Sequence, residues 1–135
     1  MHKELEEKLY KKYPELFKEK DWDISESCMP WGMEFGDGWY WIMDTLCSAI
    51  TVYCKNTKLE LPRFGQVKEK FGELRVYSDN IDPKIDGMIF LAELQSMKTC
   101  ENCGAQDESV KTAGRGHIVT FCEECREKIN KKWEK

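Results

Sequence analysis

Two Cys-x-x-Cys pairs constrain the fold of this chain more than any other feature of its sequence. Cys100 and Cys103 form the first pair, in TCENCG, and Cys122 and Cys125 form the second, in FCEEC. A Zn²⁺ ion takes four ligands at the corners of a tetrahedron, and each pair presents two thiolates from one tight turn. The spacing therefore predicts that these four cysteines hold a structural Zn²⁺.

The residues around the two pairs predict how this part of the chain folds. Gly104 allows the backbone to reverse after the first pair, and the stretch that follows has the length of a short hairpin. The second pair opens a segment with a helical pattern, where the free N–H groups of the first turn stabilise thiolates. We therefore expect residues 100–135 to form a treble-clef-like zinc module that packs on a domain of residues 1–99.

The sequence offers no set of residues for catalysis. Four cysteine ligands complete the coordination sphere of a zinc ion, whereas a catalytic zinc keeps one coordination position open for water or substrate. A nuclease of the HNH type needs a histidine base, but only His2 and His117 occur, and we expect His117 at the surface or in packing. Phosphate-binding glycine loops, GxSxG and metalloprotease motifs are also missing from the sequence. The sequence therefore predicts a protein that is not an enzyme.

The other three cysteines and the N-terminal residues indicate the compartment. A total of seven cysteines without an apolar leader argues against a disulfide framework. Cys47 and Cys54 share one face of an expected helix and are expected to be buried, and Cys28 has no assigned role. No apolar run approaches the length of a membrane span. We expect a cytoplasmic protein without a membrane partner.

Hydrophobic periodicity predicts an α+β fold, in which helices pack around a small β-hairpin. Apolar residues at four-residue spacing indicate an amphipathic helix over residues 3–13. The long apolar run over residues 39–55 indicates a central core helix, with Asp37 as its N-cap. Asp82 and the proline that follows it indicate the start of a third helix, over residues 83–98.

The segment FGQVKEKFGELRVYS predicts the hairpin, over residues 64–78 with a turn at Gly72. Alternation places Val67, Glu69 and Phe71 on one face. The opposite face carries three cations and an aromatic that could hold a phosphate or a nucleic-acid backbone: Lys68, Lys70, Arg75 and Tyr77. Because the net charge of −4 gives no overall basic excess, a solvated sheet face is the alternative.

A tryptophan-rich segment precedes the expected core helix. PWGMEFGDGWYW contains Trp31, Trp39 and Trp41. Tryptophan is among the residues that contribute most to binding at protein interfaces. The sequence therefore suggests two roles for this segment, namely structural packing and an exposed surface that binds a partner through these three side chains.

Four blocks of the sequence resemble, in order, a family of small proteins found in bacteriophages and prophages. These blocks are GDGWYWIMDTLC, QVKEKFGELRVY, TCENCG and FCEEC, and the resemblance covers residues 32–126. It implies a phage setting and a structural zinc, but it implies no reaction. Many of these relatives end the second pair with a histidine, whereas Cys125 stands at that position here.

Three functions are consistent with these features. The first is a non-enzymatic phage or prophage accessory protein that binds a host protein, for example a defence or replication factor. The second is a nucleic-acid-binding accessory protein that uses the hairpin cations and a lysine-rich last helix. The third is a protein that captures a small anionic ligand such as a nucleotide with the same cations. The sequence leaves the target and the oligomeric state open.

Overall fold

A β-hairpin in the middle of the chain is the centre of the fold in the computed structural model, which describes residues 1–133. Strands β2 (Phe64–Lys70) and β3 (Glu73–Ser78) are antiparallel, and the short strand β1 (Met33–Glu34) pairs in parallel with β2. Lys68 lies opposite Arg75 in this register. Directly opposed side chains share a face, so the four residues predicted to share one do so: Lys68, Lys70, Arg75 and Tyr77.

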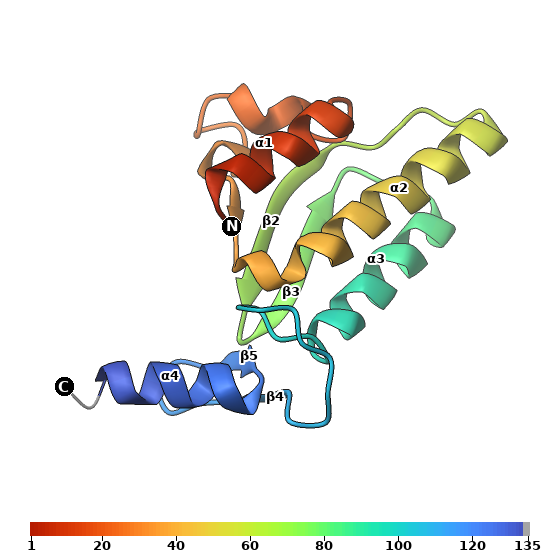
Figure 1. Ribbon diagram of the computed structural model, residues 1–135. Coiled ribbons are helices and arrows are strands. Elements are labelled where there is room, and N and C mark those ends of the chain that lie inside the picture. The colour runs from red at the N-terminus through yellow and green to blue at the C-terminus, as the bar shows by residue number, and fades with distance from the viewer. Residues whose placement is uncertain (134–135) are drawn as a thin grey trace.

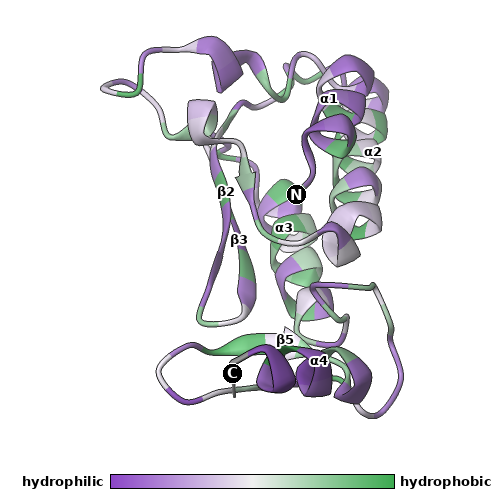
Figure 2. Cartoon of the chain, turned by 60° about the vertical axis from the view of Figure 1, so that its left-hand side comes forward, coloured by the Kyte–Doolittle hydropathy of each residue, from purple (hydrophilic) through white to green (hydrophobic). Residues whose placement is uncertain are grey.

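Three α-helices accompany this sheet, as the α+β prediction required. They are α1 (Lys3–Lys12), α2 (Tyr40–Thr57) and α3 (Pro83–Ser96), and α2 and α3 lie side by side against the hairpin (Figure 1). Short 3₁₀ turns link the earlier elements, at Lys18–Asp21, Met29–Trp31 and Asp37–Trp39. The C-terminal part adds β4 (Lys111–Ala113), β5 (Val119–Phe121) and the mostly hydrophilic α4 (Glu123–Trp133), below the hairpin tip (Figure 2). Within residues 1–133, no helix has the length and apolar character of a membrane span.

The main core lies between the hairpin and the helices. Val67, Leu74 and Val76 of the sheet are buried there in one cluster with residues of α2 and α3. Cys47 and Cys54 of α2 belong to this core, which confirms the prediction that they are buried. Burial raises the pKa of the Cys47 thiol far above its usual range, so Cys47 stays protonated and acts as a small apolar residue.

The starts of α2 and α3 illustrate one wrong prediction and one correct one. The carboxylate of Asp82 accepts a hydrogen bond of 2.8 Å from the N–H of Lys84, so Asp82 is the N-cap of α3 as predicted. Asp37 does not cap α2, which begins at Tyr40 after a 3₁₀ turn and has no side-chain cap. The Asp37 carboxylate instead accepts hydrogen bonds from the backbone N–H and the Nδ1 of His2, which fix α1 beside this turn.

Helix α3 covers the free edge of β3. The backbone N–H of Leu74 donates to Oγ of Ser96 at 2.9 Å, and that of Val76 donates to Oε2 of Glu93 at 3.2 Å. These donors point away from β2 and have no partner strand. Side chains of α3 therefore accept the hydrogen bonds of an edge strand that would otherwise be open to pairing with another strand.

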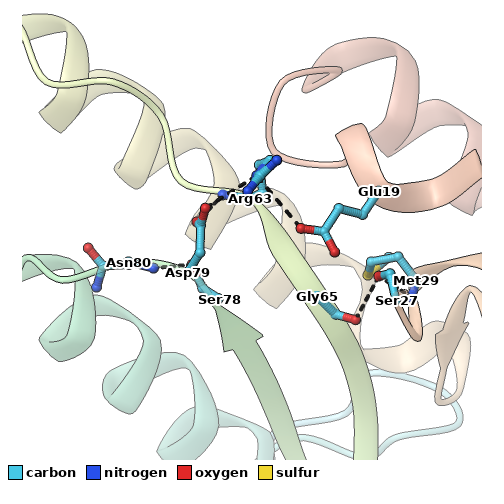
Figure 3. A network of polar contacts seen from close by, with 8 residues as sticks. All are labelled: Glu19, Ser27, Met29, Arg63, Gly65, Ser78, Asp79 and Asn80. Atoms are coloured by element: carbon cyan, nitrogen blue, oxygen red, sulfur yellow. Dashed lines mark hydrogen bonds and ion pairs between the residues drawn. The ribbon is translucent and has the colours of Figure 1, made fainter. Parts of the chain in front are cut away.

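A polar network joins the N-terminal segment to the open end of the sheet (Figure 3). The Nε of Arg63 lies 3.2 Å from the carboxylate of Asp79 and 3.7 Å from that of the buried Glu19. The guanidinium also lies over the ring of Trp22, 5.0 Å from its centroid. Arg63 therefore fastens the segment between α1 and β1 to the ends of β2 and β3.

The turn of the central hairpin differs from the predicted alternation. Phe71 and Gly72 both have positive φ, 53° and 81°, and together they form the two-residue turn between β2 and β3. Phe71 therefore does not share the core face of Val67, and 70% of its surface is exposed. The left-handed conformation costs a residue with a side chain roughly 1–2 kcal/mol, and Asn or Gly is preferred at this position.

Candidate metal centre

The four cysteines of the two pairs come together in one cluster. The sulfur atoms of Cys100, Cys103, Cys122 and Cys125 all lie within 4.8 Å of one another, and the Cys103 and Cys122 sulfurs are 3.7 Å apart. Four sulfurs at about 2.3 Å from a tetrahedral metal ion would be about 3.8 Å apart. The cluster therefore has the size of a tetrahedral metal site and could hold a metal ion.

Two knuckles from distant parts of the chain position these sulfurs. The first knuckle follows α3 and ends at Gly104, which has a φ of +84°. The N–H of Gly104 donates to the carbonyl of Cys100 at 2.9 Å. In the second, Cys122 follows β5 directly and Cys125 lies in the first turn of α4. This arrangement confirms the hairpin and the helix that the sequence predicted between and after the pairs.

The protein surroundings affect the thiols of Cys100 and Cys125 in opposite directions. Burial opposes ionisation of Cys100, but backbone N–H groups of Cys103, Cys122 and Asn102 stabilise its thiolate and lower its pKa. Burial raises the pKa of Cys125 to about 12, and the neighbouring thiols add to this rise against a hydrogen bond from Asn102. Because adjacent thiolates repel one another, a divalent cation between them favours the loss of all four protons.

Arg126 holds the remainder of this module together. Its guanidinium donates to the carbonyl oxygens of Ala113, Lys111 and Val119 at 3.0, 2.6 and 3.1 Å. Both strands of the β4–β5 hairpin are therefore attached to α4 by one side chain. A small apolar cluster around the cysteines, distinct from the main core, also stabilises the module.

The GDGW motif packs directly on the first knuckle. A Cβ added to Gly38 would lie 2.1 Å from the carbonyl oxygen of Cys100, so only glycine fits without a shift. The Gly38 N–H donates to the carbonyl of Glu101 at 2.8 Å, and the Gly36 N–H donates to its carboxylate at 2.9 Å. The indole N–H of Trp39 donates to the carbonyl of Thr99 at 2.9 Å. The start of α2 therefore positions the first cysteine pair.

The tip of the central hairpin also packs on the module. The Thr120 hydroxyl of β5 donates to the carbonyl of Gly72 at 2.6 Å, and its backbone carbonyl accepts from Glu101 at 2.9 Å. Thr120 also shares a 2.6 Å hydrogen bond with the hydroxyl of Thr112 on β4. Both distinctive sequence blocks, GDGW and QVKEKFG, thus contact the cysteine module.

The three tryptophans proposed as a partner surface have different environments. Trp39 is fully buried in the core, where its ring packs on Phe35 and its indole N–H donates to Thr99, so its assignment to an exposed surface is wrong. Trp41 is partly buried against the same core, whereas Trp31 is 64% exposed. The structure therefore does not bring the three side chains together on one exposed surface.

Carboxylates accompany the predicted cations on the open face of the hairpin. Arg75 lies 3.2 Å from the carboxylate of Glu73, and Glu34 of β1 is the register partner of Lys68. Lys70 is exposed beside Phe71, with its Nζ 5.9 Å from the ring centroid. The face is therefore mixed in charge along its length, because Glu73 is also the register partner of Lys70 next to the turn.

Sequence reasoning missed an exposed apolar surface on α3. We call it the outer face of α3; its four large side chains are exposed by 38–61% and one glycine lies among them: Gly87, Phe90, Leu91, Leu94 and Met97. A Cβ added to Gly87 would meet no atom within 4 Å. The helix carries apolar residues on nearly every side, so its periodicity does not indicate which side is left exposed.

The described residues offer the cysteine cluster as their one candidate metal site. Across residues 1–133, no other group of histidine, cysteine or acidic side chains is arranged to hold a metal ion. Comparisons with protein-family models, curated proteins and solved structures found no match to this chain. The geometry of the cysteine cluster and the exposed surfaces is therefore the basis for assigning a function.

Proposed function

We propose that the protein is a non-enzymatic binding protein whose C-terminal residues form a treble-clef-like module around a structural Zn²⁺. The four-sulfur cluster supports zinc, because thiolates in a tetrahedral set of this size are its preferred ligands. Four protein ligands leave no position for a substrate or a water, so the metal has a structural role. It joins the knuckle that follows α3 to the end of β5 and the first turn of α4.

The outer face of α3 carries the proposal that the protein acts by binding another protein. Phe90 and Leu91 are 61% and 58% exposed, and Leu94 follows them on the same side of the helix. Large apolar side chains grouped on one surface are typical of interaction sites. Gly87, which its own chain leaves uncovered, gives a partner room for close approach. We propose that the partner places an apolar helix or strand against this face.

The resemblance to bacteriophage and prophage proteins gives the proposal its setting. It makes a bacterial host protein the expected partner and the host cytoplasm the expected location. A defence or replication factor would be a partner of this kind. These assignments depend on the sequence resemblance alone, and the choice of α3 does not depend on them.

The experiment compares two single substitutions of exposed aliphatic residues in capture from a bacterial lysate. Leu94→Glu places a charge in the outer face of α3, and Val52→Glu places one on α2, where Val52 is 54% exposed. We expect one protein to be captured by the wild type and by Val52→Glu at near-equal amounts. Capture by Leu94→Glu should fall at least tenfold, because a buried unpaired charge is costly.

Two results would contradict this assignment. Undiminished capture by Leu94→Glu would show that the partner binds elsewhere. A concentration-dependent dimer in sedimentation velocity, present in Val52→Glu and lost in Leu94→Glu, would assign the face to a second copy of the chain instead of a host protein.

A further inference from the structure

The tips of the two β-hairpins form a cleft that the protein-binding proposal does not use. The cleft has a volume of about 400 Å³ and is lined by Glu69, Lys70, Phe71, Gly116, His117 and Ile118, among others. Its two sides come from the β2–β3 turn and from the loop between β4 and β5. The hydrogen bond from Thr120 to the carbonyl of Gly72 fixes these two parts against each other.

Phe71 is the least expected residue of this cleft. Its φ of 53° is unfavourable for an aromatic side chain, and 70% of its surface is exposed. Gly72, with which it forms the turn, is buried against Thr112 and Thr120, so the conformation of the turn is fixed by packing. Exposure and strain together mean that neither the core nor the turn requires a phenylalanine here. Strain of this kind is typical of functional sites.

The charges near Phe71 favour an anionic ligand. The Lys70 ammonium lies 5.9 Å from the Phe71 ring centroid, and the exposed Arg115 lies between two glycines of the opposite loop. The one carboxylate in the lining, that of Glu69, accepts a hydrogen bond of 3.0 Å from the Gly72 N–H and is thus engaged in the turn. Lys68 lies two residues from Lys70 on the same face. Of the carboxylates on that face, Glu73 pairs with Arg75 at 3.2 Å and Glu34 lies beside Lys68, which leaves Lys70 available to a ligand.

The geometry points to a binding site for single-stranded nucleic acid, in which Phe71 stacks on a base and Lys68, Lys70 and Arg115 contact the phosphates. An exposed aromatic ring flanked by cations is how proteins bind single strands without reading sequence. A paired duplex does not offer an unstacked base to such a ring. This site is separate from the outer face of α3, so either proposal can fail without the other.

The test is fluorescence anisotropy of labelled oligo(dT) of about 20 nucleotides with the zinc-loaded full chain. If three cations contact phosphates, the Kd should weaken roughly 20-fold between about 50 and 200 mM salt. Phe71→Asn should raise the Kd about tenfold or more. The same substitution should raise Tm by a few degrees, because Asn-Gly is the preferred pair for a turn with two positive φ values.

Ile81→Asn is the matched control, because Ile81 is 95% exposed and follows the opposite end of β3. It should leave the Kd unchanged. Lys70→Gln provides a second variant that keeps the turn, and it should weaken binding and reduce its salt dependence.

Four results would overturn the proposal. The first is a failure to bind oligo(dT) at about 50 mM salt, and the second is unchanged affinity in both Phe71→Asn and Lys70→Gln. The third is equal affinity for a duplex of the same length. The fourth is competition by a mononucleotide that binds as tightly as the oligonucleotide. The last result would assign the cleft to a small anionic ligand.

Discussion

The indole N–H of Trp39 donates a hydrogen bond of 2.9 Å to the carbonyl oxygen of Thr99, the residue before the first cysteine of the cluster. Both residues are almost fully buried. This contact connects the start of the central helix to a knuckle 60 residues further along the chain. The folding of the helical part and the positions of the cysteines are therefore coupled.

Replacing Trp39 with phenylalanine tests this coupling. Trp39→Phe keeps an aromatic ring but leaves the buried Thr99 carbonyl without its donor, which costs about 1–3 kcal/mol. We expect the free energy of unfolding in urea to fall by that amount. Zinc affinity should fall as well, because the first knuckle loses a fixed anchor. An unchanged unfolding midpoint and unchanged zinc affinity would show that Trp39 only fills space.

Glu93 is expected to make stability depend on pH. Burial raises the pKa of its carboxyl above the usual value, against the hydrogen bond from Val76 and the nearby Arg75, and Glu73 adds to the rise. A raised pKa in the folded state means that Glu93 favours folding most below the usual glutamate pKa. This contribution is lost as the pH rises through the folded-state pKa.

The variant Glu93→Gln isolates this effect, because its amide oxygen can still accept the hydrogen bond from the Val76 N–H. We expect the stability of the variant, relative to the wild type, to increase from about pH 4 to pH 7. Urea unfolding at several pH values measures the difference. A difference that is constant with pH, or that decreases with pH, would contradict the assignment.

Gly87 should lower the stability of α3 without any packing benefit within the chain. A glycine inside a helix costs about 1 kcal/mol relative to alanine, and a Cβ at this position would meet open space. Gly87→Ala should therefore raise the free energy of unfolding by about 1 kcal/mol. Partner binding through the outer face of α3 should weaken. A destabilised Gly87→Ala would mean that this part of α3 is packed more closely than we describe.

Metal removal should unfold one part of the molecule and preserve the other. A strong chelator should abolish amide protection in β4, β5 and α4, since their own apolar cluster is small. The main core between the hairpin, α2 and α3 should remain folded, because the buried residues of that core do not include the cysteine pairs. Hydrogen exchange with and without chelator distinguishes the two parts. Equal protection in both states would argue against a metal-dependent module.

The cysteine module and the helices were predictable because their signals are local. A Cys-x-x-Cys knuckle, the hairpin between the pairs and the Asp82 cap each depend on residues only a few positions apart. The same holds for the alternation of Lys68, Lys70, Arg75 and Tyr77 on one face of the hairpin. These features follow from backbone geometry, and distant parts of the chain do not change them.

The errors arose where distant residues decide the outcome. Asp37 has the sequence context of an N-cap, but His2 binds its carboxylate. Trp39 is of a residue type that is common in binding surfaces, but the first knuckle and the core enclose it. Phe71 continues the alternation of β2, yet the tight turn with Gly72 reverses the chain there. Periodicity alone cannot report such contacts between segments that are far apart in sequence.

Zinc content measured by native mass spectrometry tests the structural zinc most directly. Wild-type protein purified at neutral pH should carry one Zn²⁺ per chain, and so should Cys28→Ser, which alters an exposed cysteine outside the cluster. Cys122→Ser should lose the metal, because the cluster then retains only three thiolates. A wild-type protein that binds no zinc when zinc is supplied, or a Cys122→Ser variant that retains one tightly bound ion, would contradict the account.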